Sequence, residues 1–327
     1  MPRPLPGCQL IRVLRNGPVT EVWLGRLDGE EQPIVVKRAV DPADEDTLQR
    51  LVEAGAVAAA AAHPDLRSPR GTIDDPPGLA VVYPYVEGGT LRCLLDERGA
   101  LSAGELVALF SPVAAMLDAL APSGFVHGDL TPSNILLRTD GTPLVIDPGT
   151  PGAAVPAYAD PTFATGREPC ARSDVFSLGV IAYEALIGRL PHRGEPAEIL
   201  ALAAAGAHRR LDTWPGVSPD VAVVVETALS ADPSQRHDDA ASFLEALSAV
   251  VDPEEVRLPG PVANPGTTLV PPEDETLEFG PRPDAAAESP ARTGGWRAAL
   301  RAAISWPSRG RLARWPTRSA SSNWRCP

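Results

Sequence analysis

Two neighbouring segments constrain this chain more than any other feature: residues 127–137, HGDLTPSNILL, and residues 144–149, LVIDPG. Pro132 prevents a regular helix in the first segment, because a proline ring removes an N–H and clashes with the preceding helical turn. Short apolar runs, which end the first segment and begin the second, flank the dipeptide Asp140-Gly141, a strong signal for a tight hairpin turn. The sequence therefore predicts a loop followed by a β-hairpin.

Three oxygen-bearing side chains should converge at the open end of this hairpin. Asn134 precedes the first strand, Asp147 follows the second strand, and Asp129 lies five residues before Asn134 in the loop. Hard oxygen ligands suit Mg²⁺, which is usually held by one or two protein groups together with phosphates. The remaining carboxylate could accept a proton from a hydroxyl. The alternative is a hairpin with ordinary turn residues.

This pattern resembles the catalytic loop and the metal loop of the protein kinases, H-R-D-x-x-x-x-N followed by D-F-G. The resemblance implies that Asp129 is the catalytic base and that Asn134 and Asp147 hold Mg²⁺. Two positions depart from the family pattern: Gly128 replaces its Arg, and Pro148 replaces its Phe.

A second match lies downstream, where residues 171–188 predict an apolar and therefore buried helix. It resembles the central helix of the large kinase lobe, in which Asp174 would accept backbone N–H bonds from the catalytic loop; the alternative for Asp174 is a plain helix cap. The segment 232–236, DPSQR, resembles D-P-x-x-R, whose Arg pairs with a family Glu. Thr162 replaces that Glu, so Arg236 must find another acid.

Lys37 is the single lysine beside 28 arginines, and it ends the predicted strand 33–37, PIVVK. This strand resembles V-A-I-K, which implies that Lys37 contacts the phosphates of ATP. The following helix, residues 44–62, should supply a Glu that orients the lysine. Glu53 is the best candidate, although it lies one residue early relative to the His-Pro pair that ends the helix. The alternative is a surface Glu.

Residues 9–14 and 20–26 predict a hairpin where kinases carry their Gly-rich loop. Only Gly17 remains of the three family glycines, and glycine allows backbone N–H groups to approach phosphate closely. A weaker grip on phosphate is therefore expected. The resemblance implies that the other residues of the ATP site are Leu14, Val22, Val35, Tyr83, Val86 and Leu136.

The resemblance covers residues 8–250 and identifies the chain with bacterial, actinobacterial-type serine/threonine kinases. It implies an α+β, two-lobed fold with a small β-rich N-lobe, residues 8–86, and a larger helical C-lobe, residues 87–250. The implied reaction is transfer of the γ-phosphoryl of Mg·ATP to Ser or Thr hydroxyls. Slow transfer is expected, because Thr131 replaces a lysine that neutralises the phosphoryl group.

Phosphorylation of the activation loop is not expected to switch this protein, because Gly128 removes the Arg that would pair with the phosphate. Two alternatives stay open. The first is a pseudokinase that acts as a nucleotide-gated binding or scaffold module, favoured by the altered motifs. The second is a small-molecule kinase, since His-Gly-Asp also resembles aminoglycoside-type phosphotransferases.

Charge is distributed unevenly along the chain. The net charge is −13, and subtracting the eight arginines that follow Ser289 leaves −21 on the rest. An acidic body argues against nucleic acid as a partner. The four cysteines share no disulfide or metal spacing, and neither a signal peptide nor a membrane span is predicted. We therefore expect a cytoplasmic protein.

The C-terminal part divides into two segments. Residues 251–293 are rich in Pro and acids and predict a disordered linker. Within it, Thr276 lies in an acidic motif, DETLEF, of the type that such kinases phosphorylate and FHA domains bind; the alternative is an inert linker. Residues 294–327 combine Arg with Trp, which suits an anionic membrane surface or an acidic protein. The alternative is a disordered basic tail.

Overall fold

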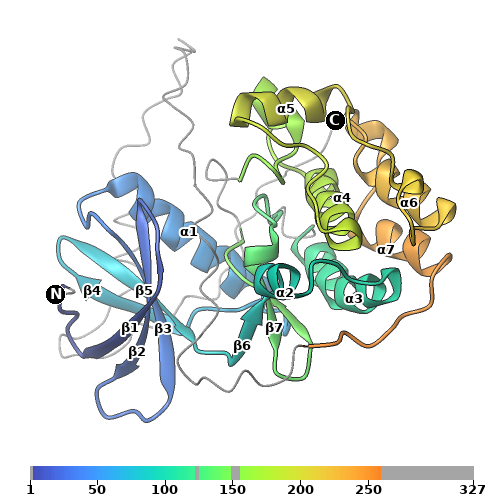
Figure 1. Cartoon of the computed structure of the whole chain (residues 1–327). Coiled ribbons are helices and arrows are strands. Elements are labelled where there is room, and N and C mark those ends of the chain that lie inside the picture. The colour runs from blue at the N-terminus through green and yellow to red at the C-terminus, as the bar shows by residue number, and fades with distance from the viewer. Residues whose placement is uncertain (1–2, 122–124, 149–154, 259–327) are drawn as a thin grey trace. The chain divides into compact units, whose positions relative to one another are not determined.

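The computed structural model describes residues 3–121, 125–148 and 155–258 (Figure 1). These residues form two compact units that are described separately. Unit 1 ends at Tyr85 and unit 2 resumes at Val86, one residue before the predicted end of the N-lobe. A short segment, Ala61–Arg67, belongs to unit 2 although its first residue is also the last residue of a helix of unit 1.

Unit 1 is an antiparallel sheet with one helix. Its elements are β1 (Cys8–Asn16), β2 (Thr20–Leu27), β3 (Pro33–Ala39), α1 (Glu45–Ala61), β4 (Gly71–Asp75) and β5 (Gly78–Pro84). The five strands are ordered β1-β2-β3-β5-β4. The predicted hairpin, the predicted lysine strand and the predicted helix are therefore confirmed, whereas β4 was not predicted.

The two faces of this sheet carry different apolar clusters, because side chains alternate along a strand. One face buries Trp23, Ile34, Val36 and Val82. On the other face, the cluster of Val35, Val81 and Tyr83 also includes Leu51 from α1. The helix therefore packs on the face from which Val35 projects.

Unit 2 combines a small sheet with helices. Its elements are β6 (Gly88–Thr90), α2 (Leu91–Arg98), α3 (Ala103–Leu120), η2 (Pro132–Asn134), β7 (Ile135–Arg138), β8 (Pro143–Val145), η3 (Pro161–Thr165), α4 (Ala171–Ile187), α5 (Pro196–Ala204), η4 (Leu211–Thr213), α6 (Pro219–Ala228), η5 (Pro233–Gln235) and α7 (Ala240–Ser248). The predicted β7–β8 hairpin is confirmed. So are the helices that the sequence predicts near residues 102–121, 171–188, 196–207, 219–231 and 238–250, which correspond to α3 to α7. The short elements β6 and α2 were not predicted.

Two helices form the centre of unit 2. The segment 102–105, SAGE, has the sequence pattern of a capping box, and the box is present at the start of α3: Ser102 Oγ accepts from the Glu105 N–H at 3.1 Å, and Ser102 N–H donates to Glu105 Oε2 at 2.9 Å. By length and composition α3 could cross a membrane, but 61% of it is buried in the protein, as in a core helix. In α4, Gly179 permits close packing on α6, since a Cβ there would lie 2.8 Å from Ala228 Cβ.

The structure corrects the start of the predicted linker. Residues 252–258, predicted to be disordered, lie against α3 and the β7–β8 turn. Local composition gave no sign of this, because the contacts are made with distant parts of the chain. The remainder of the linker, Thr276 and the tail 294–327 lie outside the described residues.

A buried histidine gives unit 2 a pH dependence. His192 is 2% exposed, and neither ring nitrogen has a hydrogen-bond partner in the described part of the chain. Its ring meets that of His208 edge-on, with centroids 6.0 Å apart. Burial, together with the nearby charge of His208, lowers the pKa of His192 to about 4.

We expect His192→Leu to flatten the pH dependence of stability between pH 6.5 and 4. An unfolded histidine titrates near pH 6.5, so in this window only the unfolded state binds the proton, and the free energy of unfolding falls as the pH falls. One such proton contributes at most about 1.4 kcal/mol per pH unit. Urea denaturation at several pH values measures the slope. His63→Gln is the control, and an unchanged slope in His192→Leu would contradict the assignment.

Candidate active site

The catalytic loop is held by a buried carboxylate on α4. Asp174 accepts hydrogen bonds from the backbone N–H groups of His127 and Gly128, both at 2.8 Å. Asp174 is not the helix cap, because that position belongs to Cys170. Burial raises the pKa of Asp174 to about 6, against the lowering effect of the two N–H bonds. The family role predicted for Asp174 is confirmed by this geometry.

His127 links the loop to the segment that precedes Asp147. Its Nδ1 lies 3.3 Å from the Asp129 N–H and must accept, so its Nε2 carries the proton and donates to the Ile146 carbonyl at 3.0 Å. Burial lowers the pKa of His127 to about 4. The ring is therefore neutral at pH 7, and its two nitrogens connect the catalytic loop at Asp129 to Ile146, the residue before Asp147.

Gly128 adopts a backbone conformation that explains its residue type. Its φ is +73°, in the left-handed region that glycine enters without steric cost. Space does not restrict this position, since an added Cβ would come no closer than 3.9 Å to Pro169. Glycine therefore adopts this conformation without strain, whereas the cation of the family's Arg is missing from this position.

The predicted convergence of Asp129 and Asn134 is observed. A 3₁₀ turn, η2, ends at Asn134, whose Nδ2 donates to the Asp129 carbonyl at 2.8 Å and to Asp129 Oδ2 at 3.3 Å. Asn134 is 4% exposed. These bonds use the amide nitrogen, which leaves Oδ1 as the atom that can face a cation. Asp129 also accepts from the Val155 N–H at 3.4 Å, in the segment that follows the metal loop.

The β7–β8 hairpin brings Asp147 to the same end. Ile135 pairs with Val145, and Ile146 N–H donates to the Asn134 carbonyl at 2.9 Å. Asp147 itself has φ +59°, a conformation that Asp tolerates better than most residues and that often marks functional sites. Its Oδ1 lies 3.9 Å from Arg67 Nη2.

This donor set fits Mg²⁺. The amide oxygen of Asn134 and the carboxylate of Asp147 are hard oxygen ligands placed at the open end of one hairpin, before its first strand and after its second. Mg²⁺ prefers such oxygens and keeps positions for water and phosphate. The site also contains a replacement that is expected to slow transfer. Thr131 stands in the place of the family lysine and is 2% exposed. The loop therefore has a buried hydroxyl where the family has a cation.

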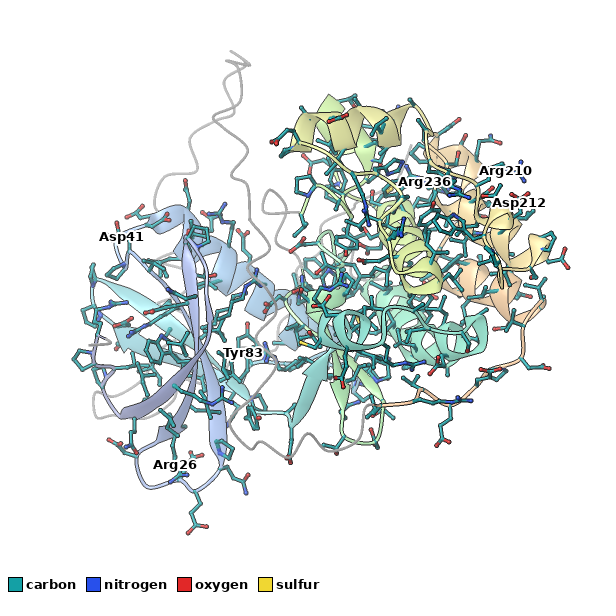
Figure 2. The ribbon with its side chains drawn as sticks, viewed as in Figure 1. Arg26, Asp41, Tyr83, Arg210, Asp212 and Arg236 are labelled. Atoms are coloured by element: carbon teal, nitrogen blue, oxygen red, sulfur yellow. The ribbon has the colours of Figure 1, made fainter. Side chains whose placement is uncertain are left out.

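Beyond the catalytic loop, Arg236 finds its acid in Asp160. The guanidinium donates to both carboxylate oxygens, at 2.7 and 3.1 Å, and to the Ser230 and Arg172 carbonyls. Figure 2 shows Arg236 among the helices of unit 2. The Arg236 guanidinium lies over the Phe176 ring of α4, 4.8 Å from the ring centroid. Burial raises the pKa of Asp160, but the bonds and charge of Arg236 outweigh it and hold this pKa below its usual value.

A second buried network fixes Tyr158, two residues before Asp160. Its hydroxyl donates to Glu184 Oε2 at 2.6 Å, and Arg92 Nη1 donates to Glu184 Oε1 at 2.7 Å. Ser177 Oγ also donates to the Tyr158 carbonyl at 2.9 Å. The segment after the activation loop is therefore held by α2 and α4.

In unit 1, several predicted nucleotide residues share one face of the sheet. Val35 and Tyr83 are buried in one apolar cluster, and Leu14 and Val22 pack against it. Lys37 lies opposite Val22 on β2 and Val81 on β5, and directly opposed residues project from the same face. Lys37 therefore projects beside this cluster. Gly17 lies in the β1–β2 turn, where its N–H donates to the Thr20 carbonyl at 2.9 Å.

The role predicted for Glu53 is wrong. Glu53 is on the exposed side of α1, where its carboxylate accepts from Gln49 Nε2 at 2.7 Å. The next residue, Ala54, is buried at 2% exposure. One residue corresponds to a rotation of about 100° on a helix, which is enough to turn the carboxylate away from the packed face.

The remaining two nucleotide residues belong to unit 2. Val86 directly follows the unit boundary and is half-buried. Leu136 is half-buried on β7, between Thr90 of β6 and Leu144 of β8. Sequence reasoning missed Asp160 and the Tyr158–Glu184 pair. The signal that could have identified Asp160 is its position two residues before Thr162, the residue that replaces the family Glu.

Comparisons with known proteins agree with this geometry. The family model of protein tyrosine and serine/threonine kinases matches residues 8–243. The serine/threonine-protein kinase PknL of Mycobacterium tuberculosis is 34% identical over 199 residues, which cover 55% of this chain and 50% of PknL. The serine/threonine-protein kinase PknA of Corynebacterium glutamicum is 28% identical over 260 residues, 73% of this chain and 55% of PknA.

A solved structure shows the same fold. The kinase domain of Mycobacterium tuberculosis PknI superposes with a TM-score of 0.62 at 22% identity, covering 75% of this chain and 96% of that domain. The chain spans about half the length of the curated relatives it matches. The α+β, two-lobed fold is thereby confirmed, and the chain belongs to the protein tyrosine and serine/threonine kinase family.

Proposed function

We propose that this chain is a serine/threonine protein kinase that transfers the γ-phosphoryl of Mg·ATP to a hydroxyl of a protein substrate. The observation that carries the proposal is the assembled catalytic loop. Asp129 and Asn134 are hydrogen-bonded to each other, and the loop backbone is bonded to Asp174. A base must be held in position before it can act on a substrate, and these bonds supply that support.

Each residue has a distinct part in the proposed reaction. Asp129 accepts the proton of the attacking hydroxyl, and Lys37 binds the phosphates of ATP. Asn134 and Asp147 would hold Mg²⁺, which neutralises charge on the phosphate oxygens. Their support comes from the β7–β8 hairpin, since Ile146 N–H donates to the Asn134 carbonyl beside Asp147.

The transfer is proposed to be slow. Buried Thr131 offers no cation to the phosphoryl group, and Gly17 is the single glycine of the phosphate loop. Loss of one such electrostatic donor typically costs roughly 10²–10³ in rate. The position of Glu53 also supports slow transfer, because its exposed carboxylate is bonded to Gln49 and does not orient Lys37.

We further propose that the enzyme does not depend on phosphorylation of its activation loop. Activation-loop phosphates act by pairing with arginines that order the segment. Here Tyr158 is bonded to Glu184, and Asp160 to Arg236, by groups that the chain already contains. These contacts support the proposal that the segment around Tyr158 and Asp160 is ordered without a phosphate.

The test is a measurement on the full chain with Mg·ATP. We expect Mg·ATP to raise the melting temperature, since a ligand that binds only the folded state stabilises it. We also expect slow transfer of phosphate to a general acceptor protein, and Lys37→Met should weaken both effects. The placement of Glu53 favours the second candidate, a pseudokinase. A thermal shift without any phosphate transfer would establish that candidate instead, and the absence of a shift would exclude both.

A further inference from the structure

Residues 252–258, here called the strap, bind the beginning of α3. Glu254 N–H donates to the Gly104 carbonyl at 2.9 Å, and Ser102 Oγ donates to Glu254 Oε2 at 2.6 Å. The fit requires glycine at position 104. A Cβ on Gly104 would lie 2.5 Å from Glu254 Cγ and 2.8 Å from the Asp252 carbonyl oxygen.

A buried carboxylate of α3, that of Glu105, also binds the strap. Glu105, at 2% exposure, accepts two bonds from Arg98, one from Ser102 N–H and one from Arg257 N–H at 2.9 Å. Arg98 also donates to the Arg257 carbonyl at 2.9 Å. Burial raises the pKa of Glu105, but these bonds outweigh it and lower the pKa to about 2. The N–H and the carbonyl of Arg257 are therefore both bonded to one ion pair.

The other end of the strap lies on the turn of the β7–β8 hairpin. A Cβ on Gly141 would be 3.7 Å from the Val256 carbonyl oxygen and 4.0 Å from Leu258 Cγ. Val256 and Leu258 are half-buried, whereas residues 252–255 are all exposed. Figure 1 shows the orange segment that leaves α7 and passes α3 toward this hairpin.

The hairpin is short, and its open end carries the predicted metal ligands. β7 has four residues and β8 has three. Asn134 directly precedes β7, and Asp147 follows β8 after one residue. Few ladder bonds orient so short a hairpin, so the surface on which its turn packs should influence the position of its ends. Ligands must be held within about 0.5 Å of a productive geometry.

We propose that the strap positions the β7–β8 hairpin and thereby tightens Mg²⁺ binding at Asn134 and Asp147. This inference rests on the metal site of the proposed function. The strap residues act through the hairpin and touch neither metal nor substrate. The catalytic unit therefore extends to Leu258, and the first residues of the linker belong to it.

The experiment uses full-length variants and two readouts. Gly104→Ala should displace the strap, because the added Cβ would clash with Glu254. The helix α3 itself should not be weakened, since alanine favours a helix more than glycine does. Glu254→Ala removes the bond to Ser102 and is a milder second variant. Glu255→Ala is the matched control, because it removes the same charge from a side chain with no hydrogen bond among the described residues. Backbone hydrogen exchange and the Mg²⁺ dependence of the ATP-induced melting shift are then measured.

In Gly104→Ala we expect exchange at least about tenfold faster at the Glu254 and Arg257 amides, and faster exchange at Arg138 and Gly141 in the hairpin turn. The Mg²⁺ concentration for half of the melting shift should rise about tenfold, the lower end of the range for loss of an outer support of a metal ligand. Glu254→Ala should show the same changes with a smaller size, and Glu255→Ala should match the wild type.

Three results would overturn the proposal. Unprotected Glu254 and Arg257 amides in the wild type would mean that the strap is not bound. A released strap with unchanged hairpin exchange would remove the coupling, and so would unchanged Mg²⁺ dependence. If the wild type transfers no phosphate, the proposed function fails while the Mg²⁺ dependence of ATP binding still decides this inference. If it does not bind Mg·ATP, the claim about Mg²⁺ binding fails together with the proposed function, and exchange at Arg138 and Gly141 decides only whether the strap positions the hairpin.

Discussion

Asp129→Asn is expected to lower phosphate transfer by about 10²–10⁴, the usual contribution of a positioned general base. Asparagine keeps the size of the side chain and can still accept from Asn134 Nδ2, which lies 3.3 Å from Asp129 Oδ2. The loop should therefore keep its conformation. Transfer to an acceptor protein and the Mg·ATP-induced melting shift are measured together, and only the transfer should fall.

Asp212→Asn is the control for this variant. Asp212 is exposed beside Arg210 at the edge of unit 2 (Figure 2), and the same chemical change there should leave transfer unchanged. Equal transfer by Asp129→Asn and the wild type would remove Asp129 from the role of base. If neither the wild type nor Asp129→Asn transferred phosphate above background, while Mg·ATP still raised the melting temperature, the chain would be a nucleotide-binding pseudokinase.

Arg236→Met is expected to destabilise the protein by about 3–5 kcal/mol, the usual cost of removing one partner of a buried ion pair. The side chains of Arg236 and Asp160 are 0% and 1% exposed. Without the guanidinium, the Asp160 carboxylate would stay buried beside a neutral residue. Urea denaturation gives the free energy of unfolding.

Two further variants separate the buried charge from the lost packing. Arg210→Met breaks the exposed pair with Asp212 and should cause no measurable loss, because solvent screens such pairs. The double variant Arg236→Met with Asp160→Leu should lose less stability than Arg236→Met alone, since no unpaired charge remains. A double variant that is less stable than the single would show that the network matters chiefly through its other bonds. These include the bond of Asp160 to the Thr162 N–H.

Some features were determined by the sequence alone because they depend on neighbours along the chain. The β7–β8 hairpin follows from two apolar runs around Asp140-Gly141, and the start of α3 follows from Ser102 and Glu105. The spacing of Asp129 and Asn134 was enough to predict that they meet. In each of these cases the contacts span only a few residues, so local rules apply.

Glu53 shows where such rules stop. Its position could be counted from the end of α1, but the direction of a helical side chain depends on which face the helix buries. Leu51 packs on the sheet of unit 1, and this packing leaves Glu53 exposed. A residue count with an error of one could not resolve that rotation.

Other features were decided only by the tertiary structure. The sequence indicated that Arg236 needs an acid, but only packing selects Asp160, which is 76 residues away. The strap has the composition of a disordered linker, yet Arg257 is bonded to Glu105, 152 residues earlier. In both cases a buried charge binds groups that the fold brings within reach. The physical reason is that burial removes water as a partner, so each polar group must find another in three dimensions, where sequence spacing gives no guide.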